Sequence, residues 1–287
     1  MASSPTTEPL VWLITGAARG FGYELAKQAL ERGDRVVATA RDRARAEQAL
    51  GTHERLLAID LDVTKEGAAD AAVAAALDRF GRIDVLVNNA GNGLLGAIEE
   101  VSDREARDVF DTNVFGLLAV TRAVLPTMRR QRSGRVLHMS SVGGVDARAA
   151  FGVYSATKFA VEAIGVAMRY ELAPLGIDVT IVEPGTFSTD FLDASSLARA
   201  AARIDDYAAS SGVAHTWADE TNHAQPGDPV KAATAMIEAV AAAEPPLHLA
   251  LGADAVARIE GHLDATRAEL DRWRPLSLST DHDRPSA

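Results

Sequence analysis

The 287-residue sequence contains no cysteine, which excludes disulfide bonds and thiolate metal sites and fits a reducing compartment. It also lacks any run approaching the roughly 20 apolar residues of a membrane span. The first nine residues are polar and show neither a basic region nor an apolar region of the kind found in signal peptides. These absences predict a cytoplasmic protein without a membrane partner.

Positive charge is also in deficit. The chain carries 29 Lys and Arg residues against 40 Asp and Glu residues, a formal net charge of −11. Such a balance argues against nucleic acid or an anionic membrane as a partner. Any anionic ligand must therefore meet a local cluster of basic side chains.

No linker rich in Pro, Gly or Ser divides the sequence, and 47% of its residues are hydrophobic. This content is enough to bury a large core. We therefore expect one catalytic domain over residues 10–274, preceded by a flexible segment, residues 1–9, and followed by a polar tail, residues 275–287.

Strand and helix patterns alternate along the domain. Seven short, mostly apolar runs are typical of buried strands, at residues 10–14, 35–40, 56–59, 83–87, 135–139, 177–182 and 247–251. Helical patterns lie between them, including 102–111, 113–130, 153–172 and 253–273. The alternation predicts an α/β fold, a doubly wound parallel sheet of about seven strands with helices on both faces, Rossmann-like, with ligands at the carboxyl ends of the strands.

A glycine-rich loop, Thr15–Gly22, joins the first strand to the first helix. Gly16, Gly20 and Gly22 let backbone amides approach an anion at the positive end of that helix. Glycines are common in turns, but the position directly after a buried strand favours a phosphate site.

Other strand ends carry polar or turn-forming residues. Asp62 follows the third strand and is equally consistent with an adenine contact and with capping of the next helix. Asn88, Asn89 and Gly91 follow the fourth strand, where side-chain amides could tie neighbouring strand ends together or simply form a turn. Pro184–Gly185 forces a turn after the sixth strand.

Tyr154 and Lys158 stand four residues apart in a helical segment, so their side chains share one face. A nearby ammonium lowers the pKa of a phenol and makes it a usable general acid or base. Ser141, thirteen residues before the tyrosine, ends the fifth strand and can turn back toward it. Taken alone, the pair could equally lie on a helix surface.

Residues 190–227 have weak periodicity, and an insertion of this length is typical of a lid or binding loop. We assign residues 187–225 as the substrate loop. The expected pocket lining is apolar and without a cation, which favours a mostly apolar carbonyl substrate over a small charged acid. Its predicted members are Leu94, Leu95, Val142, Phe151, Phe187 and Phe191, with Asp146 or His215 as a polar contact.

These motifs together resemble, in order and spacing, the short-chain dehydrogenase/reductase family in its single-domain form. The resemblance covers about residues 10–190 and rests on the glycine loop, Asn88–Gly91, Asn113, Ser141, Tyr154, Lys158 and Pro184–Gly185. It implies hydride transfer between a nicotinamide and a carbonyl or alcohol carbon of a small molecule.

The resemblance also implies roles for individual residues. Tyr154 would protonate the carbonyl oxygen and Ser141 would hold it. Lys158 would bind the nicotinamide ribose and lower the tyrosine pKa, and Asn113 would keep a water that relays protons. The implied cofactor contacts are Gly16, Arg19, Gly20, Phe21, Gly22, Arg41, Asp62, Val63, Asn89, Ala90, Gly91, Tyr154, Lys158, Pro184, Gly185, Phe187 and Thr189, the last touching the carboxamide. No metal site is predicted.

We predict a preference for NADP(H), with NAD(H) as the alternative. Arg19 and Arg41 can approach a 2′-phosphate with charge-assisted hydrogen bonds. Ala40 stands where an acidic residue would select NAD, and alanine cannot accept a hydrogen bond from the ribose. Asp42 is the competing candidate, although an aspartate there also suits the start of the next helix.

Two other functions stay open: an inactive regulator that senses dinucleotides, and a sugar-nucleotide epimerase or dehydratase. Retention of both Tyr154 and Lys158 argues against the regulator. The helical segments 113–130 and 153–172 carry more apolar surface than one sheet face covers, which predicts a homodimer or homotetramer, as the resemblance also implies.

Overall fold

A computed structural model describes residues 9–282. Seven parallel strands form one sheet in the order β3-β2-β1-β4-β6-β7-β9, so the predicted Rossmann-like fold and its seven strands are confirmed. The strands are β1 (Val11–Thr15), β2 (Arg35–Ala40), β3 (Leu56–Asp60), β4 (Val85–Asn88), β6 (Gly134–Met139), β7 (Ile177–Pro184) and β9 (His248–Leu251).

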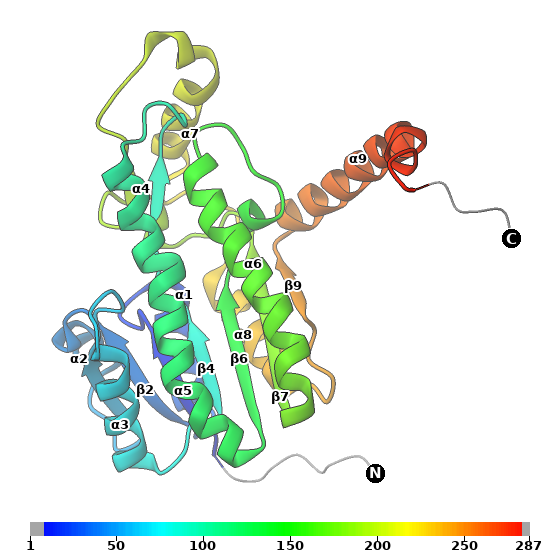
Figure 1. The fold of residues 1–287 in the computed structure, drawn as a ribbon. Coiled ribbons are helices and arrows are strands. Elements are labelled where there is room, and N and C mark those ends of the chain that lie inside the picture. The colour runs from blue at the N-terminus through cyan, green and yellow to red at the C-terminus, as the bar shows by residue number, and fades with distance from the viewer. Residues whose placement is uncertain (1–8, 283–287) are drawn as a thin grey trace, which may run out of the picture.

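Helices cover both faces of this sheet (Figure 1). Successive residues of a strand point to opposite faces, so Trp12 and Ile14 of β1 enter one core and Leu13 enters the other. The first core is closed by α1 (Gly20–Glu31), α2 (Arg43–Leu50) and α8 (Pro229–Ala241), and the second by α3 (Ala68–Phe80), α5 (Leu117–Gln131) and α6 (Gly152–Leu172). Because both faces of the sheet are buried here, the sequence of β1 is an almost continuous run of apolar residues.

The strand order reverses between β1 and β4, which are neighbours in the sheet although β2 and β3 lie between them in sequence. Loops that leave these two strands run to opposite sides and leave a crevice at the carboxyl ends. The glycine loop and Asn89 therefore meet at one edge of the sheet.

The two helices predicted over 102–111 and 113–130 form one continuous element. The helix α4 (Asp103–Phe110) begins at a capping box made by Ser102 and Glu105, and a π-helical segment, Asp111–Gly116, joins it to α5. The wider i→i+5 turn accommodates an extra residue without breaking the helix. Asn113 lies within this turn and not at a helix start.

The joined element, Asp103–Gln131, is the one helix among residues 9–282 whose length and composition would suit a membrane span. Such a pattern is weak evidence, since the core helices of water-soluble proteins also show it. Here Val120, Val124 and Met128 pack into the second core.

The insertion is more ordered than its sequence predicts. A small parallel sheet pairs β5 (Gly93–Leu95) with β8 (Leu197–Arg199), and α7 (Val213–Thr221) follows. Both strands contain only three residues, too few for a periodic signal. This sheet fixes the start of the insertion to the loop after β4.

The last helix, α9 (Ala253–Leu278), extends past the predicted end at Trp273 and runs through Pro275. Along this fully described helix Ala255 is the one buried residue, and the helix projects from the body (Figure 1). Val256, Leu263 and Leu270 recur on it at seven-residue intervals and are exposed. Residues 1–8 and 283–287 of the predicted terminal segments lie outside the described residues.

Candidate active site

A cavity of about 2060 Å³ opens at the carboxyl ends of the strands. Small-molecule pockets are usually smaller, ~300–1,000 Å³, so a dinucleotide and a substrate fit together. The predicted catalytic and cofactor residues line this cavity, with two exceptions among the described residues, Gly22 and Asn113. The structure thus brings together segments that are far apart in sequence.

The glycine loop keeps its shape because two of its glycines have left-handed backbone angles, with φ of 68° at Gly16 and 54° at Gly20. Gly22 does not line the cavity, but its lack of a side chain lets the Gly16 carbonyl and the Asn89 side chain lie close to its backbone. A Cβ there would lie 2.4 Å from the Gly16 carbonyl oxygen and 2.5 Å from Nδ2 of Asn89. Any side chain at this position would displace the loop.

Asn89 ties β4 to the glycine loop, as its position predicts. Its Nδ2 donates to the carbonyl oxygens of Thr15 and Gly16, at 2.9 and 3.1 Å. The hydroxyl of Thr15 accepts from the backbone amides of Asn89 and Ala90, both at 2.9 Å. These bonds lock the two strand ends that form the crevice.

Arg19 occupies the N-cap position of α1, where no side chain within residues 9–282 caps the helix. The first-turn amides therefore face the cavity and suit an anion. Its guanidinium contacts the substrate loop, donating to Oγ of Ser195 and Ser196, both at 2.6 Å. Arg19 thus joins the glycine loop to the substrate loop.

Arg41 lines the cavity after β2, next to Ala40. Asp42 caps α2: its Oδ1 accepts from the Ala44 amide at 3.1 Å, and its Oδ2 lies 3.8 Å from Nε of Arg45. The Asp42 carboxylate, which was the alternative candidate to bind the ribose hydroxyls, therefore caps the start of α2. Asp62 accepts from both the amide and the hydroxyl of Thr64, and these bonds hold the pKa of its carboxyl below the usual value.

Tyr154 and Ser141 meet at the cavity wall, with the Ser141 hydroxyl near enough to influence the phenol. The Tyr154 side chain is almost fully buried, and burial raises its pKa to about 12, with the Ser141 hydroxyl opposing the rise. The pKa of Tyr154 in the protein alone is therefore raised and not lowered as predicted, because desolvation of the phenolate is the largest influence on it.

Lys158 lies beneath Tyr154, with its Nζ 5.7 Å from the centroid of the tyrosine ring. Nζ donates to the carbonyl oxygen of Met139 at 2.7 Å, so the ammonium is held at the end of β6. Burial lowers the pKa of Lys158 to about 8, while the charge of Glu162 opposes this shift. The lysine thus titrates close to neutral pH.

Asn113 is buried behind the cavity. Its Nδ2 donates to the Asn92 carbonyl and to Oγ1 of Thr157, and its Oδ1 accepts from the Asn92 amide. A Cβ on Gly91 would lie 3.1 Å from Asn113 Oδ1 and 3.7 Å from Lys158 Nζ. Asn113 therefore fixes the loop after β4 against α6, on the side where Lys158 emerges.

The Pro184–Gly185 turn is fixed by a residue that the sequence reading missed. Asp254, at the start of α9, accepts from the Thr186 amide at 2.7 Å. A Cβ on Gly185 would lie 2.1 Å from Asp254 Oδ1. Thr189 follows this turn and faces the glycine loop, with its Cβ 3.6 Å from a Cβ placed on Gly20.

The substrate side of the cavity differs in part from its predicted lining. Val142, Phe151, Phe187 and Phe191 line the cavity, together with Trp217, which lies in the predicted substrate loop but was not among the predicted lining residues. Phe151 stacks edge-on against Trp217, and Phe191 lies against Tyr154.

Leu94 and Leu95 are absent from the lining within the described part of the chain, since β5 turns them into the core. His215 is likewise outside and contacts Arg203. Asp146 lines the cavity but pairs with Arg258, at 3.0 Å, and with Arg148. Contrary to the prediction, this side of the cavity therefore contains two guanidinium groups, those of Arg148 and Arg258, and both are paired with this carboxylate.

Comparison with known proteins agrees with this geometry. The family model described as short chain dehydrogenase matches residues 10–200. Oxidoreductase BOA17 of Botryotinia fuckeliana is 33% identical over 272 residues, covering 94% of this chain and 98% of that protein. The 3-ketodihydrosphingosine reductase of Bacteroides thetaiotaomicron is 38% identical over 203 residues, covering 71% and 73%.

Two solved structures are also similar. A short-chain dehydrogenase from Streptomyces avermitilis is 43% identical, with a TM-score of 0.90 over 96% of this chain and 100% of that one. The 3-ketoacyl-(acyl-carrier-protein) reductase of Brucella melitensis, solved with NADH, is 30% identical, with a TM-score of 0.72 over 85% and 97%.

Proposed function

The chain belongs to the short-chain dehydrogenase family, and from that premise we propose that it is an NADP(H)-dependent oxidoreductase acting on a mostly apolar ketone or secondary alcohol. The observation that carries the proposal is the meeting of Ser141, Tyr154 and Lys158 at the wall of the cavity that the glycine loop also lines. A regulator would have no need of this arrangement.

The residues of the crevice fit a dinucleotide. The glycine loop and the uncapped first turn of α1 present backbone amides to a pyrophosphate, and Gly22 leaves no room for a side chain. A bound nicotinamide dinucleotide supplies or accepts the hydride. The residues that would hold it are those of the glycine loop, Asp62, Asn89–Gly91, Lys158 and Thr189.

In the direction of reduction, Tyr154 donates a proton to the carbonyl oxygen of the substrate. With a pKa near 12, the phenol keeps its proton at neutral pH until charge develops on that oxygen. Ser141 orients the same oxygen by its hydroxyl. Lys158 places a cation beneath the ring, which stabilises the phenolate left behind.

The preference for NADP(H) rests on Arg41 and Ala40. Arg41 lines the cavity at the end of β2, and Asp42 is held by the start of α2 and by Arg45. Arg19 can assist only after its guanidinium leaves Ser195 and Ser196. Arg41 is therefore the main contact for a 2′-phosphate in this proposal.

The test compares kcat/KM for NADPH and NADH in the wild type and in Ala40→Asp/Arg41→Ala. We expect NADPH to be preferred in the wild type and the variant to shift toward NADH. Arg43→Ala is the matched control, since Arg43 is close to Arg41 in sequence but pairs with Asp60 and is not among the described lining residues. Equal efficiency with NADH in the wild type would refute the preference.

The proposed substrate is bulky and mostly apolar. Phe151 and Phe191 lie against Tyr154, Trp217 packs on Phe151, and Asp146 pairs with both Arg148 and Arg258, so neither guanidinium lacks a carboxylate partner. The relative from Bacteroides thetaiotaomicron is named as a reductase of a 3-keto lipid, which supports the same class. A panel of ketones against short keto acids tests this proposal, and faster turnover of the keto acids would contradict it.

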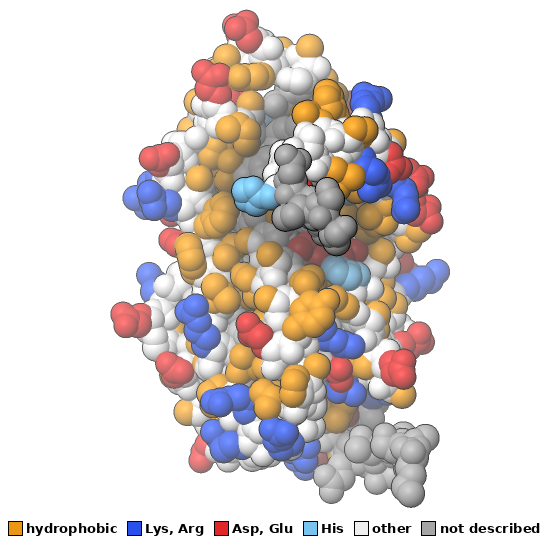
Figure 2. Space-filling model, turned by 45° about the vertical axis from the view of Figure 1, so that its right-hand side comes forward, with side chains coloured by type: hydrophobic (Ala, Val, Ile, Leu, Met, Phe, Trp, Pro, Cys, Tyr) orange, Lys and Arg blue, Asp and Glu red, His pale blue; other side chains and the backbone are white. Residues whose placement is uncertain are grey.

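We further propose that the chain works in the cytoplasm as a homodimer or larger assembly. Phe115 on the π turn and Phe159 and Tyr170 on α6 are exposed, the last by 76%. Figure 2 brings the side of the molecule with α6 and α9 forward and shows apolar side chains gathered in patches among the charged ones. Light scattering at micromolar concentration tests this, and a strictly monomeric mass would refute it.

A further inference from the structure

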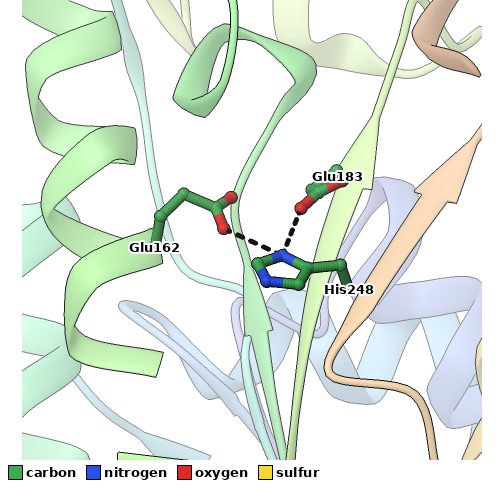
Figure 3. A group of neighbouring side chains, drawn as sticks. All are labelled: Glu162, Glu183 and His248. Carbon is green, nitrogen blue, oxygen red and sulfur yellow. Dashed lines mark hydrogen bonds and ion pairs between the residues drawn. The ribbon is translucent and has the colours of Figure 1, made fainter. Parts of the chain in front are cut away.

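Outside the cavity, three side chains of the kinds that bind metal ions converge from three elements: Glu162 of α6, Glu183 of β7 and His248 of β9 (Figure 3). One atom of each, an imidazole nitrogen or a carboxylate oxygen, lies within 4.8 Å of the other two. Figure 3 shows both carboxylates directed at the same ring nitrogen, Nδ1 of His248. None of the three is among the described residues that line the cavity, so the cluster is separate from that surface.

Glu162 is the member of the cluster whose bonding is incomplete. The residue is 9% exposed, and neither of its carboxylate oxygens has a hydrogen-bond partner among residues 9–282. A buried carboxylate is costly unless it is paired and hydrogen-bonded or coordinates a metal. The hydroxyl of Ser140, which directly follows β6, lies near enough to influence this carboxyl group and also lacks a partner in the described part of the chain. Three buried oxygen atoms thus lack a hydrogen-bond partner at one place.

His248 alone does not satisfy both carboxylates. Its Nδ1 lies 2.7 Å from Oε1 of Glu183, within hydrogen-bond distance, but 3.5 Å from Oε2 of Glu162. One ring nitrogen carries at most one N–H, and Glu183 engages it. The Lys158 ammonium, one helical turn before Glu162, donates instead to the Met139 carbonyl at 2.7 Å. Only a group that contacts all three side chains at once completes the cluster.

The spacing of these atoms suits a small divalent ion. Zinc bonds histidine nitrogen and carboxylate oxygen at ~2.0–2.2 Å in a tetrahedron, which places two of its ligand atoms ~3.3–3.6 Å apart. The 3.5 Å from His248 to Glu162 matches this spacing. The 2.7 Å contact with Glu183 has to open by less than ~1 Å, which a movement of the half-exposed imidazole allows. Two carboxylates also neutralise the charge of the ion, so the occupied site adds no net charge to the interior.

His248 gives the site access to solvent. Its side chain is 48% exposed, whereas the side chains of Glu183 and Glu162 are 4% and 12% exposed. An ion can therefore enter on the histidine side and keep a water there as its fourth ligand. The ligand types also select among ions, because imidazole suits Zn²⁺, whereas Mg²⁺ and Ca²⁺ prefer oxygen ligands.

We propose that Glu162, Glu183 and His248 bind one divalent transition-metal ion, and that Zn²⁺ fits the site best. The ion joins α6, the helix of Tyr154 and Lys158, to the strands β7 and β9 at one edge of the sheet. Because β9 has only four residues, a bond from His248 across β7 to α6 anchors this short strand. The site has a structural role, and the proposal does not depend on the proposed reaction.

Zinc binding to tag-free, chelator-treated protein tests the site, by isothermal titration calorimetry and by Tm. We expect one ion per chain and a rise in Tm of ~4 °C at ~100-fold excess of Zn²⁺ over Kd, with no rise in equal Mg²⁺. His248→Ala removes a ligand and should weaken binding by at least ~10²-fold, the upper end of the loss for an outer-shell partner. His223→Ala is the matched control: His223 pairs with Asp193 at 3.1 Å on the surface, so zinc affinity should stay unchanged.

Glu162→Gln is a second variant that keeps the side-chain shape and removes the charge. It should weaken zinc binding by at least ~10-fold, and it tests the site even if His248→Ala does not fold. Co²⁺ supplies an independent signature, because its visible absorption depends on its coordination. Wild-type protein should give the spectrum of a four-coordinate ion, and Glu162→Gln should give that of Co²⁺ in water.

Three outcomes would overturn the proposal. Zn²⁺ without effect on the Tm of the wild type would mean that the cluster is a metal-free ion pair of His248 with its two carboxylates. A rise in Tm that persists in both His248→Ala and Glu162→Gln would place the ion elsewhere, as would an equal loss of affinity in His223→Ala. Neither calorimetry nor Tm involves turnover, so a failure of the proposed reaction would leave this test intact.

Discussion

The glycine loop and the substrate loop face each other across one cavity but are stabilised in different ways. The glycine loop is held by partly buried hydrogen bonds of backbone and side-chain amides, such as those between Thr15 and Asn89. The substrate loop relies more on exposed pairs such as Arg199 with Asp219 and Tyr207 with Glu99. A pyrophosphate is the same in every dinucleotide and suits a rigid backbone site, whereas surface pairs leave the substrate side free to vary.

The two loops meet through Arg19, which donates to Ser195 and Ser196. The same arginine is the N-cap residue of α1. Movement of the substrate loop therefore changes a side chain of the glycine loop, although the backbone of the latter stays fixed. The predictions below test how far the two regions behave independently.

The largest expected effect is that of Tyr154→Phe. Tyr154 contacts Phe191 of the substrate loop, 5.5 Å between ring centroids, and lies above Lys158. Removal of its hydroxyl deletes the transferable proton and should lower kcat by at least ~10²-fold. Cofactor affinity, measured by fluorescence titration, should stay nearly constant. Activity above about a hundredth of wild type would remove Tyr154 from its assigned role.

Gly22→Ala should damage the glycine loop severely. The new methyl group would overlap the Gly16 carbonyl and Asn89, an overpacking that costs about 1–3 kcal/mol and displaces the amides that face the phosphates. We expect a lower Tm and a strong loss of cofactor binding. Gly212→Ala is the matched control in the substrate loop, where the new methyl group would lie 3.5 Å from the Tyr207 carbonyl oxygen, an ordinary contact. If both variants behaved alike, the contrast between the loops would be wrong.

A buried charge should influence stability more than the exposed pairs do. The pKa of Glu162 is about 7 in the folded protein against 4.5 in the unfolded chain, so the folded state holds the extra proton between these values. Its contribution to the free energy of unfolding is therefore present below about pH 4.5 and is lost as the pH rises to 7.

The difference in Tm between wild type and Glu162→Gln, followed from pH 4.5 to 7, measures this contribution. We expect the metal-free wild type to lose stability relative to the variant over that interval by about 3 kcal/mol, at ~1.4 kcal/mol for each unit of the rise from 4.5 to about 7. A constant difference in Tm across the interval would mean that Glu162 has an ordinary pKa.

The smallest effect is expected at the exposed pair of the substrate loop. Arg199→Ala removes a surface ion pair with Asp219, and such pairs contribute about 0–1 kcal/mol. Tm should change little, while KM for the carbonyl substrate rises and cofactor affinity stays constant. Arg274→Ala, which removes the exposed pair with Asp271 on α9, should leave both constants unchanged. A large change in cofactor affinity in Arg199→Ala would show that the loops are coupled.

Some parts of this structure could be predicted from the sequence and others could not. Apolar runs such as Val11–Thr15 mark strands buried on both faces, and residues at their ends must gather at one edge of a parallel sheet. The π turn around Asn113 was not predicted, because one extra residue barely alters helical periodicity. The sheet of β5 and β8 was not predicted, because strands of three residues are too short to show an alternation of apolar and polar residues.

Electrostatic features were harder to predict. The pKa of Tyr154 is set mainly by the burial of its side chain, which the four-residue spacing to Lys158 does not reveal. Glu162, Glu183 and His248 come from separate elements and form no local motif, so only the pairing of β7 with β9 and the packing of α6 bring them together. Contacts of this kind follow from the complete topology and not from any one segment.

The exposure of helix α9 means that hydrogen exchange along it can report whether subunits have associated. At 1.5 Å per residue its 26 residues span about 39 Å, and Ala255 is the one buried residue along its described length. Amide hydrogens on such a helix exchange with solvent through local fraying, far more easily than those of the central strands. If a second subunit covers the stripe of Val256, Leu263 and Leu270, their exchange slows. Hydrogen exchange along α9, followed as the protein is diluted, therefore reports when that surface becomes covered.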